Sequence, residues 1–260
     1  MNLLQSNLNQ NIDTKNPILL FEDGSHKIYW LGIDDETAFR CNVYLICDED
    51  EYIIVDPGNR SYFNKVKENF SQITDPKNVT GLILCHQDPD VCASMIDWLD
   101  INPNLTIFSS ARTNVLLPHY GKSDYNFHDT AEHSIYTFKS GKSLEFIEAP
   151  FLHFAGAFTT FDRSENILFS GDIWAALDID WKLVVDDDFD MHETYMDLFH
   201  IDYMSSNIAT RGFVRKLDGK IIEAILPQHG SLINSDNVQN ALTYLKELQC
   251  GTDIIYSDLD

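Results

Sequence analysis

Histidine and aspartate residues follow the ends of four predicted strands, and this arrangement constrains the fold more than any other feature of the sequence. The apolar stretches that predict these strands lie at residues 82–84, 143–147, 167–169 and 221–226. The polar residues that follow them are His86, Asp88, Asp90, His153, Asp172 and His229. An α/β scaffold builds a site in this way, from rigid strands that end in short loops. We therefore expect these six side chains to converge on one site.

Each of these residues alone has an ordinary structural explanation. Asp90 stands where the N-cap of a helix is expected, and Asp172 precedes Ile173 and Trp174 as an aspartate in a turn would. A single histidine after a strand is more often a hydrogen-bonded residue than a ligand. The segments H-x-D-x-D, L-H-F-x-G, F-S-G-D and P-x-H-G occur in one order along one chain, however, and their combination favours a metal site.

The remaining pattern predicts two β-rich halves, each followed by helices. Further strands are predicted at residues 27–31, 42–46, 52–55, 105–108, 134–138 and 157–161, and helices at 62–70, 91–99, 111–117, 193–208 and 238–248. The charged clusters at 34–36 and 48–51 are typical of exposed turns. No linker rich in Pro, Gly or Ser separates the halves, so we expect an N-terminal tail at residues 1–17 and one four-layered domain at 18–260.

Composition excludes several classes of protein. The 260 residues are 44% hydrophobic, enough for a sizeable core, and their net charge of −23 disfavours binding to nucleic acid or to an anionic membrane surface. No apolar run approaches the ~20 residues of a membrane-spanning helix, and the Asn-rich start does not resemble a signal peptide. The five cysteines include no CxxC pair, which argues against a disulfide framework or a four-thiolate metal site and favours a cytoplasmic location.

The ordered segments resemble the metallo-β-lactamase fold, and within it the flavodiiron branch and its flavin-less relatives, the oxygen-binding diiron proteins. The segments that carry the resemblance are Tyr29-Trp30-Leu31-Gly32, Val55-Asp56-Pro57-Gly58 and the four quoted above, so it extends over residues 27–231. The fold it implies is of the α/β (α+β) class, a four-layer αββα sandwich with mixed sheets. A two-metal site would lie between those sheets.

The resemblance also implies which residues hold the metals. One iron would be held by His86, Asp88 and His153 and the other by Asp90 and His229, with the carboxylate of Asp172 bridging the pair. An oxo, hydroxo or peroxo bridge between Fe²⁺/Fe³⁺ ions is compatible with such a site. Hydrolytic relatives have more histidines; carboxylates in their place favour non-haem iron over zinc.

Two residues depart from the family pattern. Asp88 stands where flavodiiron proteins usually have the longer Glu, so its reach to iron is shorter. Val91 stands where many relatives have a histidine, which would leave an open position on the second iron. An open position on a reduced diiron pair is what O₂ or NO needs in order to bind.

The implied function is a non-haem diiron protein that binds dioxygen as a sensor or carrier, or reduces it slowly. The residues after His229 contain no Gly/Ser-rich phosphate loop, so no FMN is expected in this chain. One alternative is an O₂ or NO reductase fed by a separate rubredoxin-like or flavin electron donor. Another is a dinuclear zinc hydrolase, and a metal-free scaffold is the simplest competing hypothesis. A homodimer is compatible with each of them.

Several other residues receive expectations of their own. Asp56 either orients a ligand histidine or is an ordinary turn residue, and strand alternation points Cys85 away from His86 into the core. The segment 199–207 resembles a helix that covers the metal site in the family, although its Met and Tyr suit packing. No metal role is expected for His26, His119, His128, His133, His192 and His200.

Overall fold

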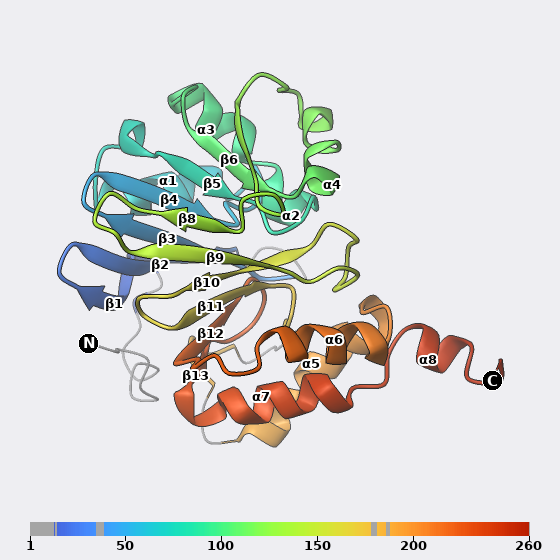
Figure 1. Ribbon diagram of the computed structural model, residues 1–260. Coiled ribbons are helices and arrows are strands. Elements are labelled where there is room, and N and C mark those ends of the chain that lie inside the picture. Colours follow the sequence, from blue (N-terminus) through green and yellow to red (C-terminus); the bar gives the residue numbers. More distant parts are fainter. Residues whose placement is uncertain (1–12, 14, 35–38, 178–180, 186–187, 260) are drawn as a thin grey trace.

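The computed structural model describes residues 13, 15–34, 39–177, 181–185 and 188–259. Its strands form two mixed sheets that pack face to face (Figure 1). The seven-stranded sheet has the order β1-β2-β3-β4-β5-β6-β7, antiparallel from β1 to β4 and parallel from β4 to β7. The six-stranded sheet has the order β13-β12-β11-β10-β9-β8 and is antiparallel except between β11 and β12.

The strands and helices have the following bounds. The first sheet contains β1 (Ile18–Asp23), β2 (His26–Asp34), β3 (Cys41–Asp48), β4 (Glu51–Val55), β5 (Gly81–Ile83), β6 (Thr106–Ser109) and β7 (Asn126–Asp129). The second contains β8 (Ile135–Thr137), β9 (Ser143–Glu148), β10 (Phe158–Asp162), β11 (Ile167–Gly171), β12 (Ala224–Pro227) and β13 (Ile233–Asn234). The helices are α1 (Phe63–Ser71), η2 (Pro76–Asn78), α2 (Pro89–Cys92), α3 (Met95–Ile101), α4 (Ala111–Asn114), η3 (Leu117–Tyr120), α5 (Phe189–Tyr203), α6 (Asn207–Lys216), α7 (Ser235–Glu247) and α8 (Thr252–Ile255).

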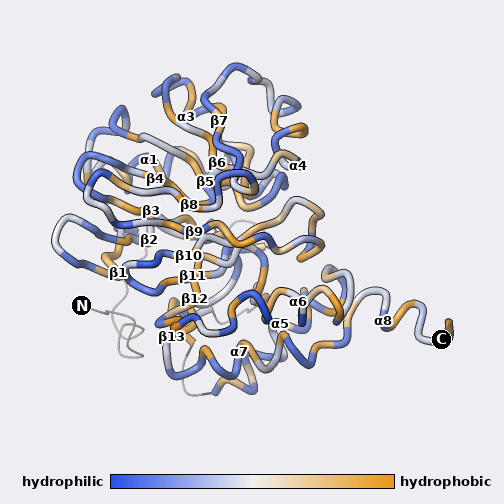
Figure 2. Tube along the Cα trace, in the orientation of Figure 1, coloured by the Kyte–Doolittle hydropathy of each residue, from blue (hydrophilic) through white to orange (hydrophobic). Residues whose placement is uncertain are grey.

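Helices cover the outer face of each sheet and complete four layers. The early helices lie over the seven-stranded sheet, and α5, α6 and α7 lie over the six-stranded sheet (Figure 1). Three apolar clusters fill the spaces between these layers, with the middle one shared by both sheets. Apolar segments accordingly run along the central strands in Figure 2. The predicted αββα sandwich with mixed sheets is confirmed.

Two predicted helices are interrupted. The helix expected at 91–99 is divided into α2 and α3, because the Ser94 amide donates to the Gly58 carbonyl at 3.0 Å while the Asp90 carbonyl accepts from the Gln228 side chain. The helix expected at 193–208 ends at Tyr203, and Ser206 then caps the separate helix α6, which the sequence analysis missed.

Other boundaries also differ from expectation. The strand β1, which begins at Ile18, was not expected. Its apolar residues do not alternate with polar ones, so the sequence carried no strand signal there. In the structure β1 is an edge strand that pairs with β2. Residues 1–12 and 14 of the predicted tail, and residues 35 and 36 of a predicted turn, lie outside the described residues. All five cysteines are buried free thiols. Within the described ranges, none of the helices has the length and apolar character needed to cross a membrane.

Candidate metal centre

The loop after β5 places the first three predicted residues. The Cys85 amide donates to Asp56 Oδ1 at 3.0 Å, which fixes the chain as it leaves the strand toward His86. Pro89 then starts α2, so that Asp88 occupies its N-cap position and Asp90 lies in its first turn. The side chains of Asp88 and Asp90 are each about one-third exposed. All three residues therefore point from one short loop and helix start toward the space between the sheets.

Asp172 comes from a tight turn at the end of β11. Gly171 precedes it with a φ of +57°, and a Cβ at that position would lie 2.7 Å from Cys85 Sγ, so glycine is required there. On the far side of the turn the Trp174 amide donates to His200 Nε2 at 2.9 Å. His200 Nδ1 in turn donates to the Met196 carbonyl, so this imidazole is a neutral link between α5 and the Asp172 turn.

His229 is held by the end of β3. The Asn42 side chain donates to the carbonyls of Pro227 and Gly230, and the Tyr44 hydroxyl donates to Pro227. The Arg40 carbonyl lies 3.2 Å from His229 Nδ1. A carbonyl can only accept, so Nδ1 carries a proton, and Nε2 is the nitrogen that faces the site and could bind a metal in place of its own proton.

The six predicted residues converge around the carboxylate of Asp172. Its Oδ2 atom lies 2.9 Å from His153 Nε2 and 3.3 Å from His86 Nε2. Its Oδ1 atom lies 3.5 Å from His229 Nε2. The two oxygens of one carboxylate thus face two different groups of side chains.

Each group is completed by one more carboxylate. Asp88 Oδ2 lies 3.4 Å from His153 Nε2 and 3.6 Å from His86 Nε2, whereas Asp90 Oδ2 lies 3.4 Å from His229 Nε2. The ligand-capable atoms of His86, Asp88 and His153 all lie within 4.8 Å of one another. The shorter side chain of Asp88 therefore does reach the group that contains His86 and His153.

The charges of these groups depend strongly on one another. Burial lowers the pKa of His153, but Asp172 and Asp88 outweigh it and raise the pKa to about 9. Burial would raise the pKa of Asp172, but the imidazoles of His86, His153 and His229 hold it well below its ordinary value. Without a metal, the imidazoles take up protons to balance the carboxylates, and a cation could replace those protons.

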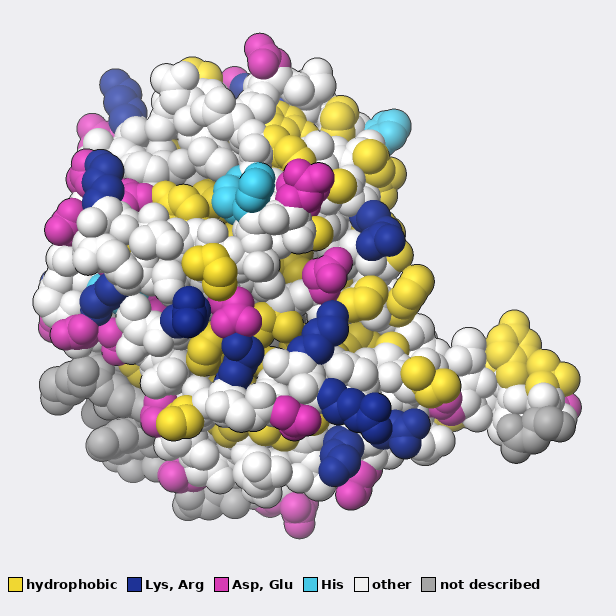
Figure 3. Space-filling view, in the orientation of Figure 1, with side chains coloured by type: hydrophobic (Ala, Val, Ile, Leu, Met, Phe, Trp, Pro, Cys, Tyr) yellow, Lys and Arg dark blue, Asp and Glu magenta, His cyan; other side chains and the backbone are white. Residues whose placement is uncertain are grey.

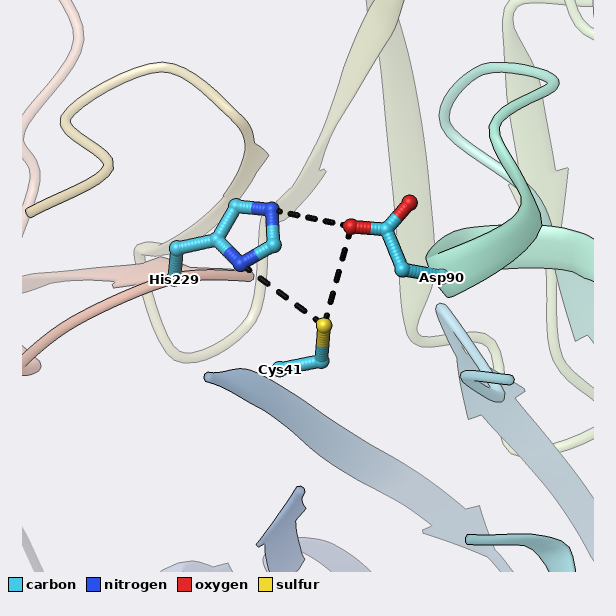
Figure 4. A group of neighbouring side chains, drawn as sticks. All are labelled: Cys41, Asp90 and His229. Atoms are coloured by element: carbon cyan, nitrogen blue, oxygen red, sulfur yellow. Dashed lines mark hydrogen bonds and ion pairs between the residues drawn. The ribbon is translucent and has the colours of Figure 1, made fainter. Parts of the chain in front are cut away.

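Cys41 lies beside the second group and was not predicted. Its Sγ atom is 3.7 Å from Asp90 Oδ2 and 3.7 Å from His229 Nδ1 (Figure 4). The thiol faces the nitrogen of His229 that points away from Asp172, and burial raises its pKa. No spacing in the sequence indicated this contact, because Cys41 is remote in the chain from both neighbours.

A cavity of about 340 Å³ opens over the two groups. Its floor contains five of the six candidate ligands, all except His86, and its roof is formed by the rings of Phe39, Phe199 and Tyr203. Phe199 and Tyr203 stack with ring centroids 4.7 Å apart, and both rings pack against His153. The space above the candidate ligands is therefore mostly apolar and suits a small neutral ligand better than an ionic one.

The other sequence expectations have mixed outcomes. Asp56 accepts from the Cys85 amide rather than contacting a histidine, so it orients the strand end. Cys85 is buried as expected, but its Sγ lies 3.1 Å from His86 Nδ1. Cys85 follows the end of β5, where strand alternation no longer applies.

In the segment 199–207, Met204 packs in the core, whereas Tyr203 lines the cavity. The six histidines without an expected metal role belong to neither group of candidate ligands in the described part of the chain.

Comparison with known proteins identifies the family. The family model described as "ODP family beta lactamase" matches residues 39–230. The chain belongs to the ODP family. Its fold is shared with the structure of the apo state of chemotaxis sensor ODP from T. denticola, at 31% identity and a TM-score of 0.82, covering 93% of this chain and 98% of that one.

Two further proteins are similar to this ODP-family chain. A structure titled "Peroxy diiron species of chemotaxis sensor ODP" matches at 30% identity and a TM-score of 0.81, over 93% of this chain and 99% of that one. The nitric oxide reductase of Moorella thermoacetica is 27% identical over 229 residues, which is 80% of this chain but only 56% of the reductase. The chain thus spans little more than half the length of that curated relative.

Proposed function

We propose that this chain is a non-haem diiron protein that binds dioxygen. His86, Asp88 and His153 would hold the first iron, Asp90 and His229 would hold the second, and the carboxylate of Asp172 would be shared by both. The observation that carries the proposal is the position of Asp172, whose Oδ1 and Oδ2 atoms face different groups of ligand-capable side chains.

The residues fit a pair of metal ions. His86 Nε2 and Asp172 Oδ1 are buried atoms without a hydrogen-bond partner, and such atoms are costly unless something occupies the space they face. The six proposed ligands are three imidazoles and three carboxylates, and the Cys41 thiol beside the second group has a pKa raised by burial, which favours its neutral form over a thiolate. Nitrogen and hard oxygen donors in this proportion suit iron that cycles between Fe²⁺ and Fe³⁺, and they argue against a zinc hydrolase.

The cavity favours a small neutral ligand such as O₂. Three apolar or aromatic side chains roof it, and the second group offers two terminal ligands against three in the first. Val91, which lies in α2, is fully buried in the core and would supply no ligand to the second iron. When bound, the reduced iron pair supplies the electrons with which O₂ reacts. The ODP sensor structure described as a peroxy diiron species supports this proposal.

Reduction of NO or O₂ by a separate electron donor is the second candidate. The similarity to the nitric oxide reductase of Moorella thermoacetica favours it, since the match includes most of this chain. Rapid turnover would need electrons from a rubredoxin-like or flavin protein. The distinguishing quantity is therefore the rate of repeated turnover with such a donor, compared with a single reaction of the reduced protein.

Anaerobic loading with iron followed by titration with O₂ tests the proposal. We expect two irons per chain and a change in visible absorption on exposure of the reduced protein to O₂, with none in zinc-loaded protein. His119→Ala, which removes a histidine remote from the candidate ligands, should behave as the wild type. Zinc preferred over iron, or no optical response to O₂ or NO in the iron-loaded protein, would contradict the proposal.

A further inference from the structure

The helix α8 stands at the base of an arm that projects from the body of the molecule (Figure 1). Its root is fixed, because the Gly251 amide donates to the Ile201 carbonyl and the Thr252 amide donates to the Ser205 carbonyl, each at 2.9 Å. Gly251 has a φ of +51°, and a Cβ there would lie 2.3 Å from the Met204 carbonyl oxygen. The direction in which the arm leaves the body is therefore set by its backbone.

Beyond this root the arm exposes apolar side chains. The exposed fractions are 48% for Ile254, 69% for Ile255, 56% for Tyr256 and 74% for Leu259. Every backbone hydrogen bond from residue 253 to residue 259 in the described chain stays within residues 250–259. A helix of one turn is not stable alone in water, and so many large apolar groups on one short segment indicate a surface that is covered in solution.

A groove of complementary character lies along α6, beside the root of the arm. It has a volume of about 320 Å³ and is lined by Pro150, Phe151, Ser205, Ser206, Ile208, Ala209, Gly212, Phe213 and Lys216. Ile208 is 74% exposed and Phe151 is 54% exposed. Gly212 has no atom within 4 Å of the place where its Cβ would be, so a second backbone could approach closely there.

The charges of the arm and of α6 are opposite in sign. The helix α6 contains Arg211, Arg215 and Lys216 and no acidic residue, in a chain whose net charge is −23. Basic side chains accordingly gather over α6 in Figure 3, while the projecting arm shows apolar ones. The arm carries the exposed Asp258 and no basic residue, while the carboxylate of Asp253 accepts from the Asn207 amide of its own α6. Lys216 lines the groove, whereas Arg211 and Arg215 lie on the same helix outside its lining, so an apolar arm with one exposed carboxylate matches an apolar groove with a basic residue at one end.

We propose that the arm of one copy lies in the α6 groove of a second copy, and the reverse, in a symmetric dimer. The arm points away from its own body, so its apolar residues are presented to another molecule. Ser205 both accepts the hydrogen bond from the root and lines the groove, so arm and groove lie side by side on each copy. A two-fold axis beside them lets both arms engage in one self-complementary interface.

Sedimentation equilibrium of the whole chain tests this dimer. We expect the wild type to be a dimer at micromolar concentration. Ile255→Asp in the arm and Ile208→Asp in the groove should each increase the dissociation constant by about 100-fold, as the loss of a central apolar anchor does. Val115→Asp, which introduces the same charge at an apolar residue that is 69% exposed and does not line the groove, should have no effect.

Complementation distinguishes this interface from any other. An equimolar mixture of the two weakened variants should form a dimer more readily than either alone, because one intact arm can still meet one intact groove. A monomeric wild type, or variants that dimerise as the wild type does, would overturn the proposal.

A crosslink shows which copy the arm contacts. All five native cysteines are buried, so Ile208→Cys combined with Ile255→Cys provides the exposed thiols. On mild oxidation we expect a disulfide-linked dimer. A disulfide within one chain would mean that the arm folds back onto its own groove and would overturn the proposal.

Discussion

Two buried clusters of histidine and aspartate lie at different places between the same two sheets, and they differ in whether both ring nitrogens of their histidines have hydrogen-bond partners, although each cluster also contains one carboxylate oxygen without a partner, Asp48 Oδ1 in the first and Asp172 Oδ1 in the second. In the first, His26 Nδ1 lies 2.8 Å from Asp48 Oδ2 and His26 Nε2 lies 2.6 Å from Asp162 Oδ2. The Ser140 hydroxyl and two backbone amides donate to the same carboxylates. In the second, the candidate metal centre, His86 Nε2 and Asp172 Oδ1 remain without a hydrogen-bond partner.

The comparison shows how a structural cluster differs from a ligand site. Both nitrogens of His26 are used within the protein, and this imidazole joins β2 and β3 of one sheet to β10 of the other. At the candidate metal centre the Nδ1 atoms of His86 and His229 contact Cys85 Sγ and the Arg40 carbonyl, while the Nε2 atoms of all three histidines face the carboxylate of Asp172. We infer that the His26 cluster contributes to stability and that the candidate metal centre sacrifices stability for metal binding.

The largest expected effect is on metal binding by Asp172→Ala. This change removes the oxygens that face both groups, so both irons should be lost. The fall in affinity should exceed the roughly 10–100-fold that loss of a supporting residue costs. Anaerobic iron titration with metal analysis measures the iron affinity. Urea unfolding of the metal-free variant checks that the fold around the His26 cluster is intact. Retention of both irons would remove Asp172 from its bridging role.

The next largest effect is on stability and comes from His26→Ala. Removing the imidazole leaves two buried carboxylates facing each other, and breaking a buried ion pair in this way costs about 3–5 kcal/mol. Iron stoichiometry should stay at the wild-type value. Urea unfolding monitored by circular dichroism gives the free energy, with the exposed His119→Ala as the matched control. A variant as stable as the wild type would show that the His26 cluster contributes nothing.

A smaller effect is the pH dependence of this stabilisation. Burial lowers the pKa of His26, but hydrogen bonds and charge from Asp162 and Asp48 outweigh it, so its folded pKa lies above the ordinary 6.5. The folded protein then binds more protons than the unfolded chain above pH 6.5, and stability from this group falls as pH rises through the folded pKa. The difference in unfolding free energy between wild type and His26→Ala should therefore be full below pH 6.5 and shrink at higher pH. A difference that grows with pH would contradict this sign.

The smallest effect is expected for Cys41→Ala. Cys41 contacts the nitrogen of His229 that faces away from Asp172, and the Arg40 carbonyl continues to hold that nitrogen when the thiol is removed. Both irons should bind, with a change in affinity below about 10-fold. Iron titration of the variant checks this expectation. Loss of one iron per chain would instead make Cys41 a ligand of the second site.

The sequence allowed the fold and the members of the candidate site to be predicted, because both depend on short local signals. Strand ends followed by His or Asp are visible in a single segment, and all six such residues do converge. The αββα order followed from the resemblance and from the alternation of predicted elements.

The features that could not be predicted from the sequence depend on contacts between segments that are distant in the chain. His26 and Asp162 are separated by 136 positions, and Cys41 and His229 by 188, so no local pattern indicated either pair. The division between α2 and α3 arises from hydrogen bonds to Gly58 and Gln228, which belong to other loops. Strand alternation failed at Cys85 because the strand had already ended.

Anomalous diffraction from crystals of anaerobically iron-loaded protein tests the central claim most directly. Data collected on either side of the iron absorption edge locate iron atoms without reference to activity. We predict two iron peaks, one beside His86, Asp88 and His153 and one beside Asp90 and His229, with Asp172 between them. A single peak, or iron bound away from Asp172, would contradict the account.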